Sequence, residues 1–159
     1  MSDTNRLIDI QLDDSGLPAP TPEVEQERRV AIFDLLEENS YGFADDRAPG
    51  GPYRLDLSIQ DGRLVFDTST EAGDKVTEFH LSLAPFRAVV KDYFQICASY
   101  FDAVKRLPAA QIEAIDMGRR GIHDEGARLL MERLEGKLLT DKLTARRLFT
   151  LICVLQAKG

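Results

Sequence analysis

The sequence contains few of the residues on which metal sites, disulfide frameworks and redox centres depend. Its 159 residues include two cysteines, two histidines and no tryptophan. Two histidines exclude a histidine-rich metal site, and Cys97 and Cys153 lack the spacing of a zinc ligand pair or a redox motif. Each cysteine lies beside large apolar residues, so we expect two reduced, buried thiols. We therefore expect no cofactor.

Catalytic and nucleotide-binding motifs are absent as well. The chain has no Gly-x-Ser-x-Gly nucleophile turn, no His-Glu-x-x-His pair and no glycine-rich nucleotide loop. Neither cysteine has the basic surroundings that a reactive thiolate requires. This absence favours a non-enzymatic role.

The charge balance and the apolar runs exclude two further classes of partner. The net charge of −7 repels phosphate backbones, so we do not expect nucleic acid to bind. The longest apolar run, LFTLICVL, is far shorter than the ~18 residues of a membrane span, and the amino terminus has no secretory signal pattern. We expect a cytoplasmic protein that binds no membrane and folds as one domain over residues 1–159.

The middle of the chain predicts a three-stranded antiparallel meander. The segments YRLDLSIQ and RLVFDTST flank Asp61-Gly62, a dipeptide typical of tight hairpin turns, which places Leu57 opposite Phe66. A second turn at Ala72-Gly73 places Phe66 opposite Phe79. Both turns bring the apolar residues to the same face of the sheet, and this agreement supports the register.

Near the amino terminus, LIDIQL at residues 7–12 has the alternation of a half-buried strand, with Ile8, Ile10 and Leu12 on one side. Thr21 and Pro22 are typical of a helix start, and this helix is expected to run to about residue 39. Residues 40–52 are predicted to form an internal loop.

Four helical segments are expected after the meander. An amphipathic helix of about 20 residues begins at Pro85, and its aromatic residues are expected in the core. Another helix begins at Pro108, a third covers residues 127–134, and Thr140 or Asp141 caps the last, most apolar one. The predicted fold class is α+β, with helices packed on one face of an antiparallel sheet.

The stretch MGRRGIHDEG, residues 117–126, places charged side chains among three glycines. Because each glycine costs about 1 kcal/mol in a helix relative to alanine, we expect a break near residues 118–121. A helix that restarts there would present free backbone amides to an anion beside Arg119 and Arg120. His123 could donate a proton or a hydrogen bond near neutral pH. These three residues are the candidate anion-binding site.

A structural role, which the sequence favours, also explains the same stretch. Asp124 and Glu125 could cap the restarted helix, and Asp116 could pair with the arginines. The alternatives are an internal cluster of salt bridges, a site for a small anion or an acidic peptide, and a catalytic site.

The predicted register also places Asp56, Asp67 and Glu78 side by side on the outer face of the sheet. Like charges in this position repel each other, at a cost of about 0.2–1 kcal/mol per pair. A divalent cation or a basic partner would explain the row. A solvated face, with Arg54 and Arg63 as diagonal neighbours, is the alternative.

Five segments carry a resemblance to a known family: EVEQERRVAIFDLLEENS, GGPYRL, APFRAVVKDYFQICASY, QIEAIDMGRRGIHDEGA and ARRLFTLICVL. Together they resemble an uncharacterised family of small acidic alphaproteobacterial proteins, and the resemblance covers nearly the whole chain. It implies a bacterial, cytoplasmic setting and no particular activity.

Two hypotheses for the function follow. The first is a non-enzymatic protein that binds a protein partner or itself, through the acidic face of the sheet or the bend at residues 119–125. The second is a sensor or enzyme that holds a phosphate or carboxylate with Arg119, Arg120 and His123.

Overall fold

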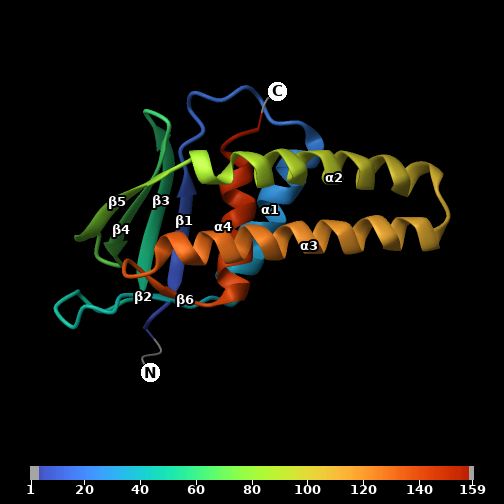
Figure 1. Ribbon diagram of the computed structural model, residues 1–159. Helices are drawn as coiled ribbons and strands as arrows, with labels where there is room; N and C mark the ends of the chain where they lie inside the picture. The colour runs from blue at the N-terminus through green and yellow to red at the C-terminus, as the bar shows by residue number, and fades with distance from the viewer. Residues whose placement is uncertain (1–3, 158–159) are drawn as a thin grey trace.

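A computed structural model of the protein describes residues 4–157 and has two layers, with a sheet on one side and helices on the other (Figure 1). The predicted α+β class is confirmed. The elements, in chain order, are β1 (Leu7–Leu12), α1 (Pro22–Glu37), β2 (Tyr41–Gly42), β3 (Tyr53–Gln60), β4 (Arg63–Thr70), β5 (Lys75–Ser82), the 3-10 turn η1 (Ala84–Phe86), α2 (Arg87–Arg106), α3 (Ala109–Leu134), β6 (Leu139–Thr140) and α4 (Lys142–Val154).

The meander has the predicted register. Strands β3, β4 and β5 are antiparallel, and Leu57, Phe66 and Phe79 are direct neighbours across them. The rings of Phe66 and Phe79 stack with their centroids 4.9 Å apart. Asp61 and Gly62 both have positive φ angles, of 53° and 73°, as a two-residue hairpin turn with this dipeptide requires.

The expectation of a purely antiparallel sheet is wrong at β1. The strand order is β1-β3-β4-β5, and β1 pairs with β3 in parallel. Parallel neighbours need a long crossover, which residues 13–52 provide with α1 in their course. The inner face of β1 also differs from the prediction, because the pairing shifts between Leu7 and Asp9 and buries Leu7 in place of Ile8.

The predicted loop at residues 40–52 begins with a short strand. Strand β2 pairs with β6 to form a second, two-stranded sheet, which joins segments that lie about 100 residues apart in the sequence. Tyr41 in β2 is fully buried, and its hydroxyl lies 2.6 Å from Thr68 Oγ1 in β4. Two residues are too few to show a period, so the sequence pattern could not indicate this strand.

Most helices lie where the sequence predicts them. Thr21 caps α1, because its side chain accepts a hydrogen bond from the Val24 amide at 3.2 Å. Asp141 caps α4 in the same way, through the Thr144 amide at 2.8 Å. The apolar run in α4 is helical and buried on all sides, as expected for a helix without a polar face.

The predicted break at residues 118–121 is wrong. Helix α3 continues without interruption from Ala109 to Leu134, so three helices follow the meander where four were expected. Gly126 lies against the ring of Phe149, which leaves no room for a side chain. Packing against α2 and α4 therefore outweighs the low helix propensity of the glycines.

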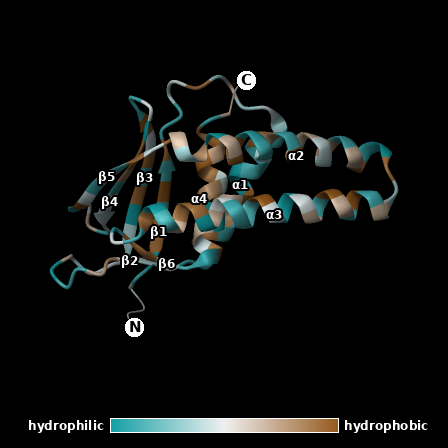
Figure 2. Cartoon of the chain, viewed as in Figure 1, coloured by the Kyte–Doolittle hydropathy of each residue, from teal (hydrophilic) through white to brown (hydrophobic). Residues whose placement is uncertain are grey.

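Helices α2 and α3 form a long antiparallel hairpin whose tip projects beyond the rest of the molecule (Figure 1). Hydrophobic and hydrophilic residues alternate in bands along both helices (Figure 2). Their inner residues belong to a core that runs from Leu7 in β1 to Leu155 after α4. Within residues 4–157, no helix combines the length and apolar character needed to cross a membrane.

Two glycines of α3 provide a matched test of this packing. A methyl group on Gly126 would lie 2.5 Å from three ring carbons of Phe149, whereas Gly121 has open space around it. We expect Gly126→Ala to lower the free energy of unfolding by about 1–3 kcal/mol through overpacking. Gly121→Ala should raise it by about 0.5–1 kcal/mol through helix propensity. Urea denaturation measures both, and equal effects would contradict the close contact at Gly126.

Candidate functional site

The structure places the arginines of the candidate anion site next to carboxylates. Arg120 Nη2 lies 2.9 Å from Asp116 Oδ2, and Arg119 Nε lies 3.4 Å from Asp116 Oδ1. Because α3 is continuous here, no helix start presents free amides to an anion. Asp124 likewise pairs with another element, at 3.4 Å from Arg146 Nε in α4.

The row of Asp56, Asp67 and Glu78 has the predicted alignment across β3, β4 and β5. Partial burial raises the pKa of Asp56, and the neighbouring carboxylate of Asp67 raises it further. The oxygens of Glu78 contact Lys75 Nζ at 3.1 Å and His80 Nε2 at 3.2 Å. Within residues 4–157, no three side chains of the metal-binding types come together to hold an ion.

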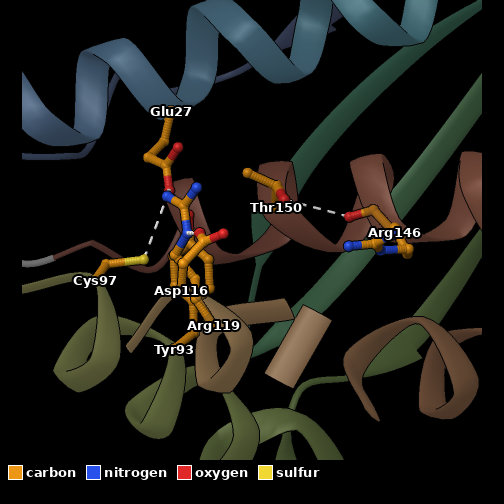
Figure 3. Close-up of polar contacts among 7 residues, drawn as sticks. All are labelled: Glu27, Tyr93, Cys97, Asp116, Arg119, Arg146 and Thr150. Carbon is orange, nitrogen blue, oxygen red and sulfur yellow. Dashed lines mark hydrogen bonds and ion pairs between the residues drawn. The ribbon is translucent and has the colours of Figure 1, made fainter. Parts of the chain in front are cut away.

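A different polar cluster forms around Glu27, which the sequence pattern did not single out. Its Oε1 atom accepts hydrogen bonds from the Tyr93 hydroxyl at 2.9 Å, the Cys97 thiol at 3.5 Å and Arg119 Nη1 at 3.3 Å. These residues, with Asp116, are called the Glu27 cluster below. They come from three helices, because Glu27 lies on α1, Tyr93 and Cys97 on α2, and the other two on α3 (Figure 3).

Arg119 is held on several sides in this cluster. Its guanidinium lies between the carboxylates of Glu27 and Asp116, and its central carbon is 4.5 Å from the centroid of the Tyr100 ring. Burial opposes the charge, but the two carboxylates outweigh this effect and raise the pKa of Arg119. The Nε atom is within ion-pair distance of Asp116 but does not reach hydrogen-bond geometry. The charge of Arg119 is thus already neutralised by the protein.

The Cys97 thiol of the cluster and the neighbouring His123 imidazole are uncharged at neutral pH. Burial lowers the pKa of His123 to about 4, and the nearby cations Arg119 and Arg146 lower it as well. The His123 ring lies 5.3 Å from the Tyr93 ring, and its Nε2 atom is buried without a hydrogen-bond partner. Burial and the charge of Glu27 raise the pKa of Cys97 to about 12. Neither group has the ionisation that a nucleophile or a general acid needs near pH 7.

A groove of about 940 Å³ lies beside the Glu27 cluster, between the first turns of α1 and the length of α2. Glu27, Tyr93 and Cys97 line it. The lining along α2 extends from Arg87 to Lys105, which corresponds to about 27 Å at the rise of 1.5 Å per helical residue. Its apolar wall consists of Val24, Val90, Phe94, Ala98, Phe101 and Val154.

The two edges of the groove differ in charge. On the α2 edge, Arg87, Lys91 and Lys105 form no ion pair within the described residues 4–157, and Asp102 is paired with Arg106. The α1 edge carries Glu23, which is also without an ion pair in that part of the chain. The groove therefore combines an apolar wall with a basic edge, although the protein as a whole is acidic.

The sequence contained one signal of this site. Val90, Phe94 and Phe101 recur at helical spacing on α2, and a stripe of this kind is usually core. Here Val90 is buried but Phe94 and Phe101 are only partly buried, because α2 packs chiefly on α3 and leaves these two rings partly open. Glu27 could not be recognised, since it is one of several acidic residues in EVEQE and its partners lie at least 66 residues away.

Comparison with known proteins gives one family. The model of the uncharacterised protein family UPF0262 matches residues 4–158. The UPF0262 protein of Jannaschia sp. (strain CCS1) is 70% identical over 94% of this chain and 96% of its own length. The UPF0262 proteins of Ruegeria pomeroyi and Paracoccus denitrificans are each 68% identical, over 98% and 95% of both chains respectively. The resemblance to alphaproteobacterial proteins is confirmed, and no solved structure matches the chain.

The Glu27 cluster predicts a local effect on stability. Glu27→Gln keeps an acceptor oxygen but removes the charge that faces Arg119, so we expect the free energy of unfolding to fall by about 1–3 kcal/mol. Glu25→Gln, on the same helix, removes only a looser pair at 3.7 Å from Arg29 and should change it by less than about 0.5 kcal/mol. Urea denaturation of both variants checks this. Similar losses in the free energy of unfolding would contradict the role given to Glu27 in the cluster.

The buried imidazole predicts a dependence on pH. The folded pKa of His123, about 4, is below its ordinary value of 6.5, so the unfolded state binds the proton first as the pH falls. The stability that a neutral His123 contributes is complete above pH 6.5 and declines toward pH 4, by up to about 3 kcal/mol. His123→Phe should remove this part of the decline in denaturation curves across that range.

The exposed histidine of β5 provides the control for this experiment. His80→Phe makes the same replacement on the outer face of the sheet and leaves His123 in place, so the decline that His123 causes should remain. If the free energy of unfolding falls equally with pH in the wild type and in His123→Phe, the result would contradict a buried neutral imidazole.

Proposed function

Because the chain belongs to the UPF0262 family, which has no assigned activity, we propose its function from the geometry: a non-enzymatic, cytoplasmic module that binds a partner protein. The partner inserts the apolar face of an amphipathic helix into the groove between α1 and α2. The observation that carries this proposal is the groove wall along α2, where Phe94 and Phe101 are only partly buried.

The dimensions of the groove support a helical partner. An amphipathic helix presents anchor residues three or four positions apart, and the apolar residues of α2 repeat at the same spacing. The groove borders about five turns of α2, which is longer than most small ligands require. Partly exposed aromatic residues such as Phe94 and Phe101 are the side chains that commonly anchor protein interfaces.

The charges of the groove define the chemistry of the partner. Arg87, Lys91 and Lys105 favour a helix that carries acidic residues along the side facing α2. Three members of the Glu27 cluster line the groove, and their polar groups are already paired within the protein, so the cluster orients α1 and α2.

The outer face of the sheet and the arginines of α3 have less support as the binding surface. No exposed large apolar side chain within residues 4–157 lies on the four-stranded sheet, so the row of Asp56, Asp67 and Glu78 offers only charge to a basic partner. An anion site at Arg119, Arg120 and His123 would have to displace Asp116, and His123 would remain neutral above its pKa of about 4.

Photo-cross-linking in the native bacterium tests the proposal. We expect a photoreactive residue at Ala98, which lines the groove, to give one protein adduct whose cross-linked segment is an amphipathic, acid-flanked helix. The same residue at Ala114, exposed on α3 outside the groove, should give none. Adding Phe101→Asp should weaken binding by about tenfold or more and abolish the adduct.

Two outcomes would overturn the proposal. The first is equal labelling from both positions, which would indicate non-specific contact. The second is the absence of any adduct at Ala98 together with a rise in melting temperature on addition of an alkyl carboxylate. A groove of this volume also suits a small amphipathic molecule, and the second result would assign it to that ligand.

A further inference from the structure

The face of α1 that points away from the core carries an apolar stripe. Val30, Phe33 and Leu36 are 43%, 66% and 38% exposed, whereas Ala31 and Leu35 on the opposite side are buried. At 100° per residue, Phe33 lies at the centre of the exposed arc, with the other two about 60° to either side. Phe33 is also the most exposed large apolar residue within residues 4–157.

Charged residues of opposite sign lie at the two ends of this stripe, so two copies of the stripe in antiparallel orientation would be complementary in charge. Arg29 precedes Phe33 by four residues, and Glu37 follows it by four. The Arg29 side chain is 73% exposed, and its only acidic neighbour within residues 4–157 is Glu25 at 3.7 Å. Glu37 has no ion pair in that part of the chain. The Glu37 charge is therefore free to meet a partner, and the Arg29 charge is held only by the loose pair with Glu25.

We propose that two copies of the chain associate through α1, with the helices antiparallel about a two-fold axis at Phe33. This arrangement brings Arg29 level with Glu37 of the second copy, and Val30 level with its Leu36. The same contacts occur twice, as in any two-fold interface. A parallel arrangement would instead place each charged residue opposite the same residue of the second copy, so that like charges would face each other.

The other members of the exposed arc are compatible with the pairing. Gln26 on this arc is uncharged, and α1 of the second copy ends at Glu37, short of the level of Gln26, so no two like charges face each other at the same height. A single pair of 16-residue helices buries less than the roughly 800 Å² per partner of a standard stable interface. The association is therefore reversible and depends on concentration.

The stripe and the groove are on different sides of α1. Glu27, which lines the groove, lies about 120° around the helix from Phe33. The stripe and the groove lining have no residue in common, so the dimer does not depend on the partner proposed for the groove.

Analytical ultracentrifugation over a concentration series tests the dimer. We expect the wild type to show a monomer–dimer equilibrium and Phe33→Asp to weaken it by about tenfold or more. Met117→Asp replaces an equally exposed apolar residue, at 64%, on the hairpin and should behave as the wild type. Circular dichroism should show that both variants remain folded, because both positions are at the surface.

Charge reversal tests the antiparallel register. Arg29→Glu or Glu37→Arg alone places like charges at both symmetric contacts and should weaken the dimer by about fivefold or more at low salt. The double variant, Arg29→Glu with Glu37→Arg, should restore it. Phe101→Asp, in the groove, should leave the dimer intact, which separates this proposal from the proposed function.

Three results would overturn the proposal. A wild type that stays monomeric at every concentration excludes the association. A dimer that survives Phe33→Asp has its interface elsewhere. Failure of the double charge reversal to restore the dimer excludes the antiparallel pairing.

Discussion

The burial of the apolar part of α4 on every side is the constraint on which the rest of the structure depends. Residues Leu148–Cys153 include five fully buried side chains, and a helix without a polar face must be covered all round. Helices α1 and α3 both pack on α4. The close approach of α3 relies on Gly126, which lets its backbone lie against the Phe149 ring. Burial of this kind contributes about 1.5–3 kcal/mol per large apolar side chain, which explains why it prevails over local propensity.

The same constraint creates the groove. Because α1 and α3 cover α4, α2 packs mainly on α3, and its contacts with α4 are few. The space between α1 and α2 is bridged by Glu27, which reaches Tyr93, Cys97 and Arg119. A partly buried carboxylate gains little net stability from such a pair, but it loses much if one partner is removed. The cluster therefore sets the position of two helices more than it adds to the stability of the fold.

The helical layer, and not the sheet, carries the surfaces suited to binding. Exposed large apolar residues lie on α1, α2, α3 and α4 and on the short strand β6, and none lies on the four-stranded sheet within residues 4–157. The acidic row of the sheet is real, but water and neighbouring cations such as Lys75 reduce its repulsion. Helix α1 has a central place in both proposals, since one side lines the groove and the other carries the stripe around Phe33.

The sequence by itself determined the local elements. The turn at Asp61-Gly62, the caps at Thr21 and Asp141 and the apolar period of α2 depend on neighbours within a few residues, so their patterns could be interpreted correctly. Only the tertiary structure decided the parallel pairing of β1, the continuity of α3 through its glycines, the β2–β6 pair and the Glu27 cluster. Each of these depends on contacts between residues far apart in the chain, whose packing energy exceeds the local preferences that a sequence pattern reports.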